Sequence, residues 1–288
     1  MISYKCKSCG SQMEFGGAAT FNCPYCGSKN FLSDKDFKGN EKFRQMLLQY
    51  YKSEAENKEK DYSKDNLWVH NGTDNYIMAN GNPLNIEYLN KNAYDGAVCY
   101  LAKENIVYVF DNIEGAEAFL SGVNRLSFPP ADTKLYRSFP ELNIKIDLKN
   151  SGRVLVFKRR PYFYPAEMFA PWPSEHLAWV ISRMENICCA LKYANLEHGN
   201  IEPSSIWINP ATHEGALFGD WRNIQNLNGV GDLQSVRKTA IALAKDTRKP
   251  IQMYDFLNSD PESNAFADFE KWDKVIIDGF GGHNFIKM

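Results

Sequence analysis

Four cysteines near the N-terminus have the spacing of metal ligands. Two CxxCG units occupy residues 6–10 (CKSCG) and 23–27 (CPYCG), with thirteen residues between Cys9 and Cys23. Each unit presents two thiolates at the edge of a tight turn, and its glycine can take the positive φ that the turn needs. Four thiolates complete the closed shell of a structural zinc and leave no position open for catalysis. We therefore expect Zn²⁺ to be bound by Cys6, Cys9, Cys23 and Cys26.

The module around these cysteines is too small to be stabilised by a core of its own. About thirty residues bury little apolar surface, so the metal should supply much of the folding free energy. Short strands are expected at residues 13–15 and 20–21. A lone CxxC could serve in redox chemistry, but two paired units favour a metal site. The three other cysteines, Cys99, Cys188 and Cys189, lie in apolar runs and are expected to be small buried hydrophobes.

A second stretch with chemical potential runs from residue 198 to 221 and reads HGNIEPSSIWINPATHEGALFGDW. It follows a long amphipathic segment and contains two β-like runs, residues 205–208 and 215–218, joined by a polar turn. Asp220 closes the second run. The pattern predicts a loop and a hairpin that present His198 at one end and Asp220 at the other.

This stretch resembles the catalytic loop of protein kinases, H-R-D-L-K-P-x-N, and the D-F-G motif that follows it. Four positions keep the family's residue types: His198, Ile201, Pro203 and Asp220. The chemical groups are replaced, because Asn200 stands at the base Asp, Glu202 at the Lys and Ser205 at the metal-binding Asn. An amide cannot accept the proton of a substrate hydroxyl. The resemblance implies a kinase-like protein without a general base, in which His198 has a scaffolding part and Asp220 is the one remaining metal ligand.

The residues that would hold a nucleotide are also replaced. When the chain is aligned on Val98, the three glycines of the family's G-x-G-x-x-G loop fall at Lys91, Ala93 and Gly96, so one glycine remains. The next strand carries Phe110 at or beside the place of the phosphate-binding lysine. We therefore expect ATP and Mg²⁺ not to bind. If a nucleotide did bind, Gly96 and Asp220 would be its contacts.

The elements that must position these residues occur in the order of the kinase family. A strand at residues 86–89, a hairpin at residues 97–102 and 106–110, a helix at 113–123 and strands at 144–148 and 154–157 predict a small lobe. In the helix, Glu114 and Glu117 lack the strand lysine as a partner. Residues 160–165 would form the hinge, and residues 175–196 predict a long amphipathic helix.

The large lobe is predicted to be abbreviated. Only eleven residues separate Asp220 from Asp232, which would cap a helix that resembles the family's F-helix. This interval leaves no room for an activation loop. The predicted fold class is thus α+β, a bilobal protein-kinase-like fold with a β-rich small lobe and an abbreviated helical large lobe, preceded by a zinc ribbon.

The expected domains divide the chain into four parts. Residues 1–32 form the ribbon, 33–82 a helical linker, 83–160 the small lobe and 161–288 the large lobe. Within the linker, apolar residues recur at helical spacing from Asn40 to about Lys58 and predict an amphipathic helix. A role of this helix in binding a partner and simple packing onto the ribbon or the next domain are both open.

Composition limits where the chain works and what it contacts. The formal net charge of -2 gives no global basic field for nucleic acid. No apolar run is long enough for a membrane helix, and the first residues lack the apolar core of a signal peptide. We therefore expect a cytoplasmic or other reducing compartment.

The leading functional prediction is a pseudokinase, a protein without enzymatic activity that binds a protein partner or acts as a scaffold. The ribbon would be its second docking module. Two alternatives stay open: a divergent ATP-binding phosphotransferase that uses Asp220, and a nucleic-acid-associated factor whose ribbon contacts phosphates through Lys5, Lys7 and Lys29. The combination of ribbon and degenerate kinase also resembles proteins of bacteria and their phages, including virion components.

Overall fold

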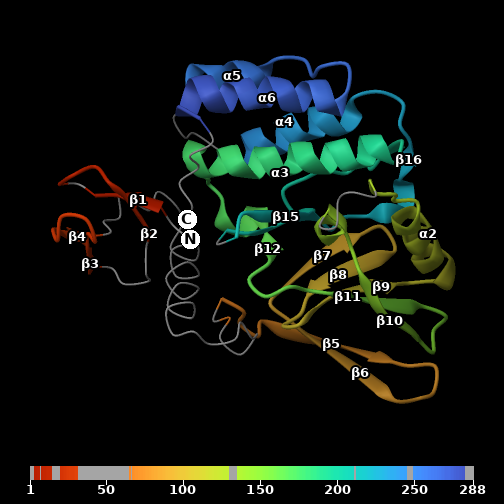
Figure 1. Ribbon diagram of the computed structural model, residues 1–288. Helices are drawn as coiled ribbons and strands as arrows, with labels where there is room; N and C mark the ends of the chain where they lie inside the picture. Colours follow the sequence, from red (N-terminus) through yellow and green to blue (C-terminus); the bar gives the residue numbers. More distant parts are fainter. Residues whose placement is uncertain are drawn as a thin grey trace.

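The computed structural model of the chain describes residues 3–6, 8–14, 20–31, 65, 67–129, 135–210, 212–244 and 249–282. The helix predicted from Asn40 to about Lys58 lies outside these residues. Three parts follow one another along the described chain: a pair of small hairpins, a lobe rich in β-strands and a lobe rich in helices (Figure 1).

Two short antiparallel hairpins make up the N-terminal module. In each hairpin a CxxCG turn joins the two strands, so residues 6–10 lie between β1 and β2, and residues 23–27 between β3 and β4. The strands predicted near residues 13 and 21 are confirmed. The four strands are β1 (Ser3–Lys5), β2 (Gln12–Glu14), β3 (Thr20–Asn22) and β4 (Lys29–Phe31).

A five-stranded antiparallel sheet forms the centre of the small lobe, with the strand order β10-β11-β9-β8-β7. The predicted hairpin is confirmed as β8 and β9, and the two strands predicted after the helix are confirmed as β10 and β11. The bounds are β7 (Asn90–Tyr94), β8 (Ala97–Leu101), β9 (Asn105–Phe110), β10 (Leu142–Asp147) and β11 (Arg153–Lys158).

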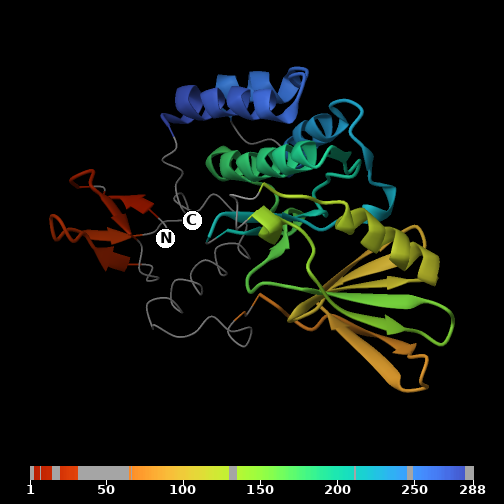
Figure 2. The same cartoon turned by 45° about the vertical axis from the view of Figure 1, so that its right-hand side comes forward.

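The strand that pairs with β8 differs from the prediction. The strand expected near residues 86–89 exists as β6 (Pro83–Tyr88), but it pairs with β5 (Gly72–Ile77) and lies outside the five-stranded sheet. The partner of β8 is β7, and since Tyr94 pairs with Ala97, only two residues join them. The β5–β6 hairpin covers the outer face of the sheet, where Ile86 packs in an apolar cluster (Figure 2).

Helix α2 (Ile113–Asn124) covers the opposite, inner face of the sheet, as predicted. Its Phe119 is fully buried among the aromatic rings of β9 and β11. At its C-terminal end, Gly122 meets the 3-10 helix η4 (Trp221–Asn223). A Cβ at Gly122 would lie 2.0 Å from the carbonyl oxygen of Trp221, so only glycine permits this approach.

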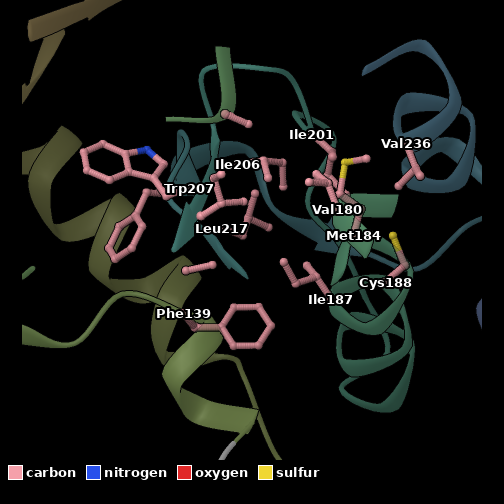
Figure 3. Close-up of a cluster of buried hydrophobic side chains, with 14 of the residues drawn as sticks. Phe139, Val180, Met184, Ile187, Cys188, Ile201, Ile206, Trp207, Leu217 and Val236 are labelled. Atoms are coloured by element: carbon pink, nitrogen blue, oxygen red, sulfur yellow. The ribbon is translucent and has the colours of Figure 1, made fainter. Parts of the chain in front are cut away.

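Helix α3 (Ser174–Tyr193) is the central element of the large lobe, as predicted from its apolar stripe. Figure 3 shows Val180 and Met184 of this helix in one apolar cluster with Ile206 and Leu217 of the neighbouring hairpin. The hairpin consists of β14 (Ile206–Asn209) and β15 (Glu214–Leu217), which confirms its prediction.

Three further helices complete the large lobe and form a layer over α3 (Figure 1). They are α4 (Gly231–Ala244), α5 (Ile251–Asn258) and α6 (Ala265–Phe280). A buried ion pair joins α4 to α6, in which Arg237 Nη1 donates to Asp268 Oδ2 at 2.7 Å. The remaining short elements are β12 (Tyr164–Pro165), β13 (Leu196–Glu197), β16 (Gln225–Asn226), η2 (Leu135–Ser138) and η3 (Ala166–Phe169).

None of the helices in the described part of the chain combines the length and the apolar character needed to cross a membrane.

Candidate metal centre and interlobe site

The four N-terminal thiols converge on one point. The Sγ atoms of Cys6, Cys9, Cys23 and Cys26 all lie within 4.8 Å of one another. The distance is 3.7 Å from Cys6 to Cys26 and again 3.7 Å from Cys9 to Cys23, so each hairpin contributes one thiol to each close pair. Cys6 and Cys23 are buried, whereas Cys9 and Cys26 are exposed. The predicted ligand set is thus arranged to hold a metal ion.

The two turns that carry these thiols repeat the same backbone pattern. Gly10 and Gly27 have φ values of 74° and 72°, and their amides donate to the carbonyls of Cys6 and Cys23. The positive φ confirms why glycine follows each CxxC unit. The hydroxyl of Ser28 lies 2.9 Å from the sulfur of Cys26 and 3.2 Å from that of Cys6, which places a polar group beside the thiol cluster.

The His198 loop is fixed by the start of helix α4. The amides of His198 and Gly199 each donate to the carboxylate of Asp232 at 2.8 Å. Asp232 had been expected to cap the helix, but it lies in the first turn of α4 and its side chain ties down the loop. The ring of His198 is fully buried, 4.6 Å from the ring of Trp221 in an edge-on contact. This burial lowers the pKa of His198 to about 4, so the ring is neutral near pH 7.

The carboxylate of Asp220 is held by an arginine two residues further along. Arg222 Nη2 donates to Asp220 Oδ2 at 2.7 Å, and Arg222 Nε donates to Oδ1 at 2.9 Å. The amide of Arg222 also donates to Oδ1 at 3.0 Å. Both oxygens of Asp220 are therefore engaged by one residue of the same chain, in the bidentate geometry that makes such pairs strong.

Arg222 reaches from Asp220 toward the edge of the small lobe. Its guanidinium lies 5.8 Å from the ring centroid of Phe110, and its Nη1 comes close to the turn at Gly96. The carboxylates of Asp95 and Asp111 act on it as well, although the hydrogen bond to Asp220 contributes most to raising the pKa of Arg222. A single cation thus sits among three carboxylates where the two lobes meet.

Aromatic side chains occupy the inner face of the sheet above Asp220. Tyr108 of β9 is fully buried, and its hydroxyl donates to the carbonyl of Gly219 at 3.1 Å. Its ring contacts those of Tyr94, Phe110, Phe119 and Phe157. Burial raises the pKa of Tyr108 well above its ordinary value, so the hydroxyl keeps its proton and acts as a donor. Asp220 consequently lies directly below the sheet.

These contacts place the His198 loop and Asp220 between a β-rich lobe with one inner helix and a helical lobe centred on α3. The body of the chain has a protein-kinase-like fold. In kinase terms, β7 to β11 form the sheet of the small lobe, α2 takes the place of the C-helix and residues 160–165 that of the hinge.

Comparisons with known proteins bear on the fold alone. No protein-family model matches the chain, and no curated protein matches its sequence. Among solved structures, WbdD in complex with a kinase inhibitor is similar at 14% identity and a TM-score of 0.47, over 66% of this chain and 46% of that one. Vaccinia related kinase 3 is similar at 13% identity and a TM-score of 0.44, over 77% and 82% of the two chains. The BubR1 kinase domain is similar at 9% identity and a TM-score of 0.45, over 67% and 80%. The chain spans about half of the length of WbdD.

The catalytic-loop positions of the kinase fold hold no general base. Asn200 is half-buried and offers an amide where the family has a carboxylate. Glu202 is turned to its own loop, because its Oε1 accepts from the Ser204 hydroxyl at 2.9 Å. Ser205 is fully buried, and its hydroxyl donates to the Glu202 carbonyl and accepts from the Glu202 amide. Both residues are thus engaged within their own loop.

The kinase phosphate loop is reduced to a two-residue turn. Lys91 and Ala93 lie inside strand β7 rather than in a loop, since they pair with Tyr100 and Val98. Gly96 has a φ of 65° and its carbonyl accepts from the Asp111 amide at 3.1 Å, so it serves the turn. A turn this short has no run of amides to close over phosphates.

Glu117 of α2, the helix in the place of the C-helix, pairs with basic residues of the sheet. Glu117 forms salt bridges with Arg153 of β11 and with Lys145 of β10, the latter at 3.3 Å. Neither partner is a lysine of β9, so the pair differs from the one that the kinase resemblance implies. Both partners lie on the neighbouring strands, and about half of the Glu117 side chain is exposed, so the pairs lie outside the closed interior of the lobe.

A small hollow remains between the lobes beside the aromatic cluster. It measures about 270 Å³ including its open mouth, and Tyr94, Cys99, Pro165 and Trp207 are among its walls.

Two residues of this site were missed by sequence reasoning. Arg222 follows Asp220 by two residues in the sequence GDWR, but no kinase motif assigns a role to that position. Tyr108 lies in a continuous apolar run of strand β9, yet its contact with Gly219 joins residues far apart in sequence. Phe110, in contrast, was identified as the residue in place of the lysine, and the structure buries it in the same aromatic cluster.

Proposed function

We propose that this chain is a pseudokinase, a kinase-like protein without phosphotransferase activity that binds a protein partner or acts as a scaffold. The observation that carries this proposal is the pairing of Asp220 with Arg222. Magnesium in a kinase requires a carboxylate at this position together with a second ligand and the phosphates of ATP. Here a guanidinium already neutralises that carboxylate, and no second ligand stands at Ser205.

The loss of catalysis does not depend on one position alone. For Mg²⁺ to bind, Arg222 would have to give up its charge-assisted hydrogen bonds to a carboxylate that is only 11% exposed. ATP would have to enter a hollow whose walls include Tyr94. A substrate hydroxyl would then find Asn200, which cannot take its proton. Each of these features supports a cleft that is closed to MgATP.

The ribbon supports the second part of the proposal, a structural zinc. A tetrahedral ion with Zn–S bonds of about 2.3 Å has sulfur–sulfur edges of about 3.8 Å. The two close pairs of thiols, at 3.7 Å, match these edges within the spread of such sites. Zinc would fix both hairpins as a rigid docking module. The three lysines that would favour nucleic acid have side chains outside the described part of the chain, so no described residue favours that alternative.

What supports a binding role is the apolar surface of the outer helices. Ile251 and Tyr254 of α5 are 63% and 56% exposed, and Ile277 of α6 is 50% exposed. Large exposed apolar side chains are typical of surfaces that contact another protein when they gather in one region.

A thermal-shift experiment with the intact chain tests the proposal. ATP, ATP with Mg²⁺, and adenosine are compared at concentrations far above those usual for kinases, and zinc is quantified in the same preparation. A ligand at about 100 times its Kd stabilises the native state by about 2.7 kcal/mol, so binding would be visible. We expect no shift with adenosine, no Mg²⁺-dependent shift with ATP and about one zinc per chain.

The outcome that would overturn the proposal is equally specific. Phosphate transfer from ATP to a protein or to the chain itself, lost on Asp220→Ala, would show a divergent phosphotransferase instead. The matched control is Asp95→Ala, which removes a carboxylate near Arg222 without touching the metal position.

A further inference from the structure

Arginines from different elements gather around one carboxylate where η2, the hinge, α3 and β15 meet. Arg160 Nη1 donates to Glu214 Oε1 at 2.9 Å, and Arg160 Nη2 donates to the carbonyl of Arg137 at 2.6 Å. The other carboxylate oxygen of Glu214 accepts from the hydroxyl of Thr212 at 2.8 Å. Both oxygens of Glu214 are therefore already used.

A third arginine, Arg183 of α3, reaches the same place without a partner. Its stem packs against Gly215, where a Cβ would come within 2.7 Å of the Arg183 Cβ. Its Nε is buried and makes no hydrogen bond to any described residue. Burial lowers the pKa of Arg183, and the carboxylate of Glu214 opposes this effect from a distance. A guanidinium that is mostly withdrawn from water and unpaired costs free energy unless something satisfies it.

The charges of this cluster do not balance. Glu214 acts electrostatically on Arg137, Arg160 and Arg183, and it is the one described carboxylate that acts on all three. The repulsion between Arg137 and Arg160 also contributes to the lowered pKa of Arg160, after its burial. Arg160 and Arg183 are half-buried, whereas Arg137 is exposed and its guanidinium is hydrogen-bonded to Tyr136. Three guanidiniums against one carboxylate leave an excess of positive charge at the edge of this cluster. Planar guanidiniums are the side chains best suited to a phosphate group, because each can donate two hydrogen bonds to its oxygens.

We propose that Arg137, Arg160 and Arg183 form a binding site for a phosphate group, either as free phosphate or on a phosphorylated side chain of a partner. A phosphate dianion would balance the excess charge and give Arg183 the acceptor that it lacks. A carboxylate has fewer oxygens and less charge to offer to three donors. The site uses none of the residues of the interlobe cleft, so it holds whether or not the chain is a pseudokinase.

The test measures binding of inorganic phosphate to the intact, zinc-loaded chain by calorimetry and thermal shift, with sodium chloride added to equal ionic strength. Arg183→Gln removes the unpaired guanidinium and should weaken phosphate binding about tenfold or more, since a charge-assisted hydrogen bond of about 1.5 to 3 kcal/mol is lost. Lys238→Gln is the matched control, because Lys238 is an exposed cation on α4 and its loss changes the net charge equally. It should leave phosphate binding unchanged.

A second variant keeps the test informative if Arg183→Gln folds poorly. Glu214→Gln removes the competing negative charge and should strengthen phosphate binding several-fold, the opposite direction. Equal weakening by Arg183→Gln and Lys238→Gln, or no effect of Glu214→Gln, would show general electrostatic attraction and overturn the proposal. Absence of any phosphate binding would overturn it as well.

The source of the phosphate is decided by further probes. O-phosphoserine and a short phosphoserine peptide are compared with the same peptide unphosphorylated. Tighter binding of the phosphopeptide than of free phosphate assigns the site to a phosphorylated partner, and equal binding assigns it to free phosphate. The same variants distinguish the two sites in the thermal-shift experiment with ATP. A thermal shift with ATP that is lost in Arg183→Gln but retained in Asp220→Ala comes from the arginine cluster and not from the cleft.

Discussion

The ribbon and the interlobe cleft differ in what each has kept. The ribbon brings together the sulfur atoms of all four predicted ligands, two from each hairpin, within 4.8 Å of one another. In the cleft, Arg222 binds the carboxylate of Asp220, and Tyr108 donates to the carbonyl of Gly219. A binding site and the fold that carries it are therefore separable in this molecule.

The two regions also differ in what stabilises them. The described part of the ribbon buries two cysteines and little else, whereas the body has a continuous core running from β8 to α6. A module of that size depends on its metal, and a core of that size does not. Loss of the metal and loss of a buried contact in the body should therefore destabilise different parts of the molecule.

Removal of the metal should unfold the ribbon and leave the body folded. Cys9→Ser removes one of four ligands, and structural zinc contributes about 10 to 16 kcal/mol in small modules, so the loss should abolish the ribbon fold. Backbone NMR spectra should lose the dispersed signals of residues 3–31, while the main calorimetric transition stays in place. Cys99→Ser is the matched control, because Cys99 is a buried thiol of the body outside the cluster. Unfolding of the whole chain with Cys9→Ser would contradict this division.

The reciprocal change breaks the body and spares the ribbon. Asp268 is fully buried and accepts hydrogen bonds from both terminal nitrogens of Arg237 and from the Glu262 amide at 2.8 Å. Asp268→Ala leaves a buried guanidinium without its carboxylate, which typically costs about 3 to 5 kcal/mol. Urea unfolding should report this loss in the main transition. Zinc affinity, measured by competition with a chelator, should stay unchanged.

A buried histidine makes the stability of the body depend on pH. The folded-state pKa of His198 is about 4, below the ordinary value of about 6.5, because burial disfavours the charged ring. The unfolded state thus binds more protons between these values, and the stability is lost as the pH falls from about 6.5 toward 4. His198 alone should remove about 2 kcal/mol between pH 7 and pH 5.

The contribution of His198 is isolated by comparing how steeply the free energy of unfolding changes with pH in a variant and in the unchanged protein. His176 is also fully buried, and its pKa is lowered to about 3, so the whole protein changes more steeply than one histidine predicts. The free energy of unfolding of His198→Gln, measured in urea at both pH values, should fall by about 2 kcal/mol less than that of the unchanged protein. Equal slopes would show that the ring at position 198 takes up its proton without unfolding. The ribbon contains no histidine, so a loss of its stability in acid would come from protons that compete with the metal for its cysteines.

The ribbon and the cleft also differ in how much of each could be predicted from the sequence. Cys6, Cys9, Cys23 and Cys26 lie in two short local motifs, so spacing alone identified them. The order of strands and helices was predictable because each element has its own periodicity. The pairing of β7 with β8 was not, since β6 has an equally strand-like pattern and only the covering of the outer face decides between them. The partners of Asp220 and Glu117 depend on side-chain directions that no spacing records.

The smallest expected change in stability concerns the ion pair of Asp220 and Arg222 in the cleft. Arg222→Ala should cost about 1 kcal/mol of stability, because the pair with Asp220 is partly exposed to solvent and its worth is reduced there. It should also free Asp220, Asp95 and Asp111, so Mn²⁺ should broaden NMR signals around residue 220 in this variant and not in the unchanged protein. Phosphate transfer from ATP should stay absent, because Asn200 still offers no base.

Restoring the general base alone should also give no phosphate transfer from ATP. Asn200→Asp supplies a carboxylate, but Arg222 still holds Asp220 and Tyr94 still lines the interlobe hollow. Since catalysis needs metal, nucleotide and base at once, the double variant Asn200→Asp with Arg222→Ala should bind Mn²⁺ and still fail to transfer phosphate from ATP. Activity in either single variant would mean that one residue separates this cleft from a working kinase, and the contrast with the ribbon would then be one of degree. Inactivity of the double variant in a radiolabelled ATP assay, with Mn²⁺ binding intact, would place the block at the rings of Tyr94 and Tyr108.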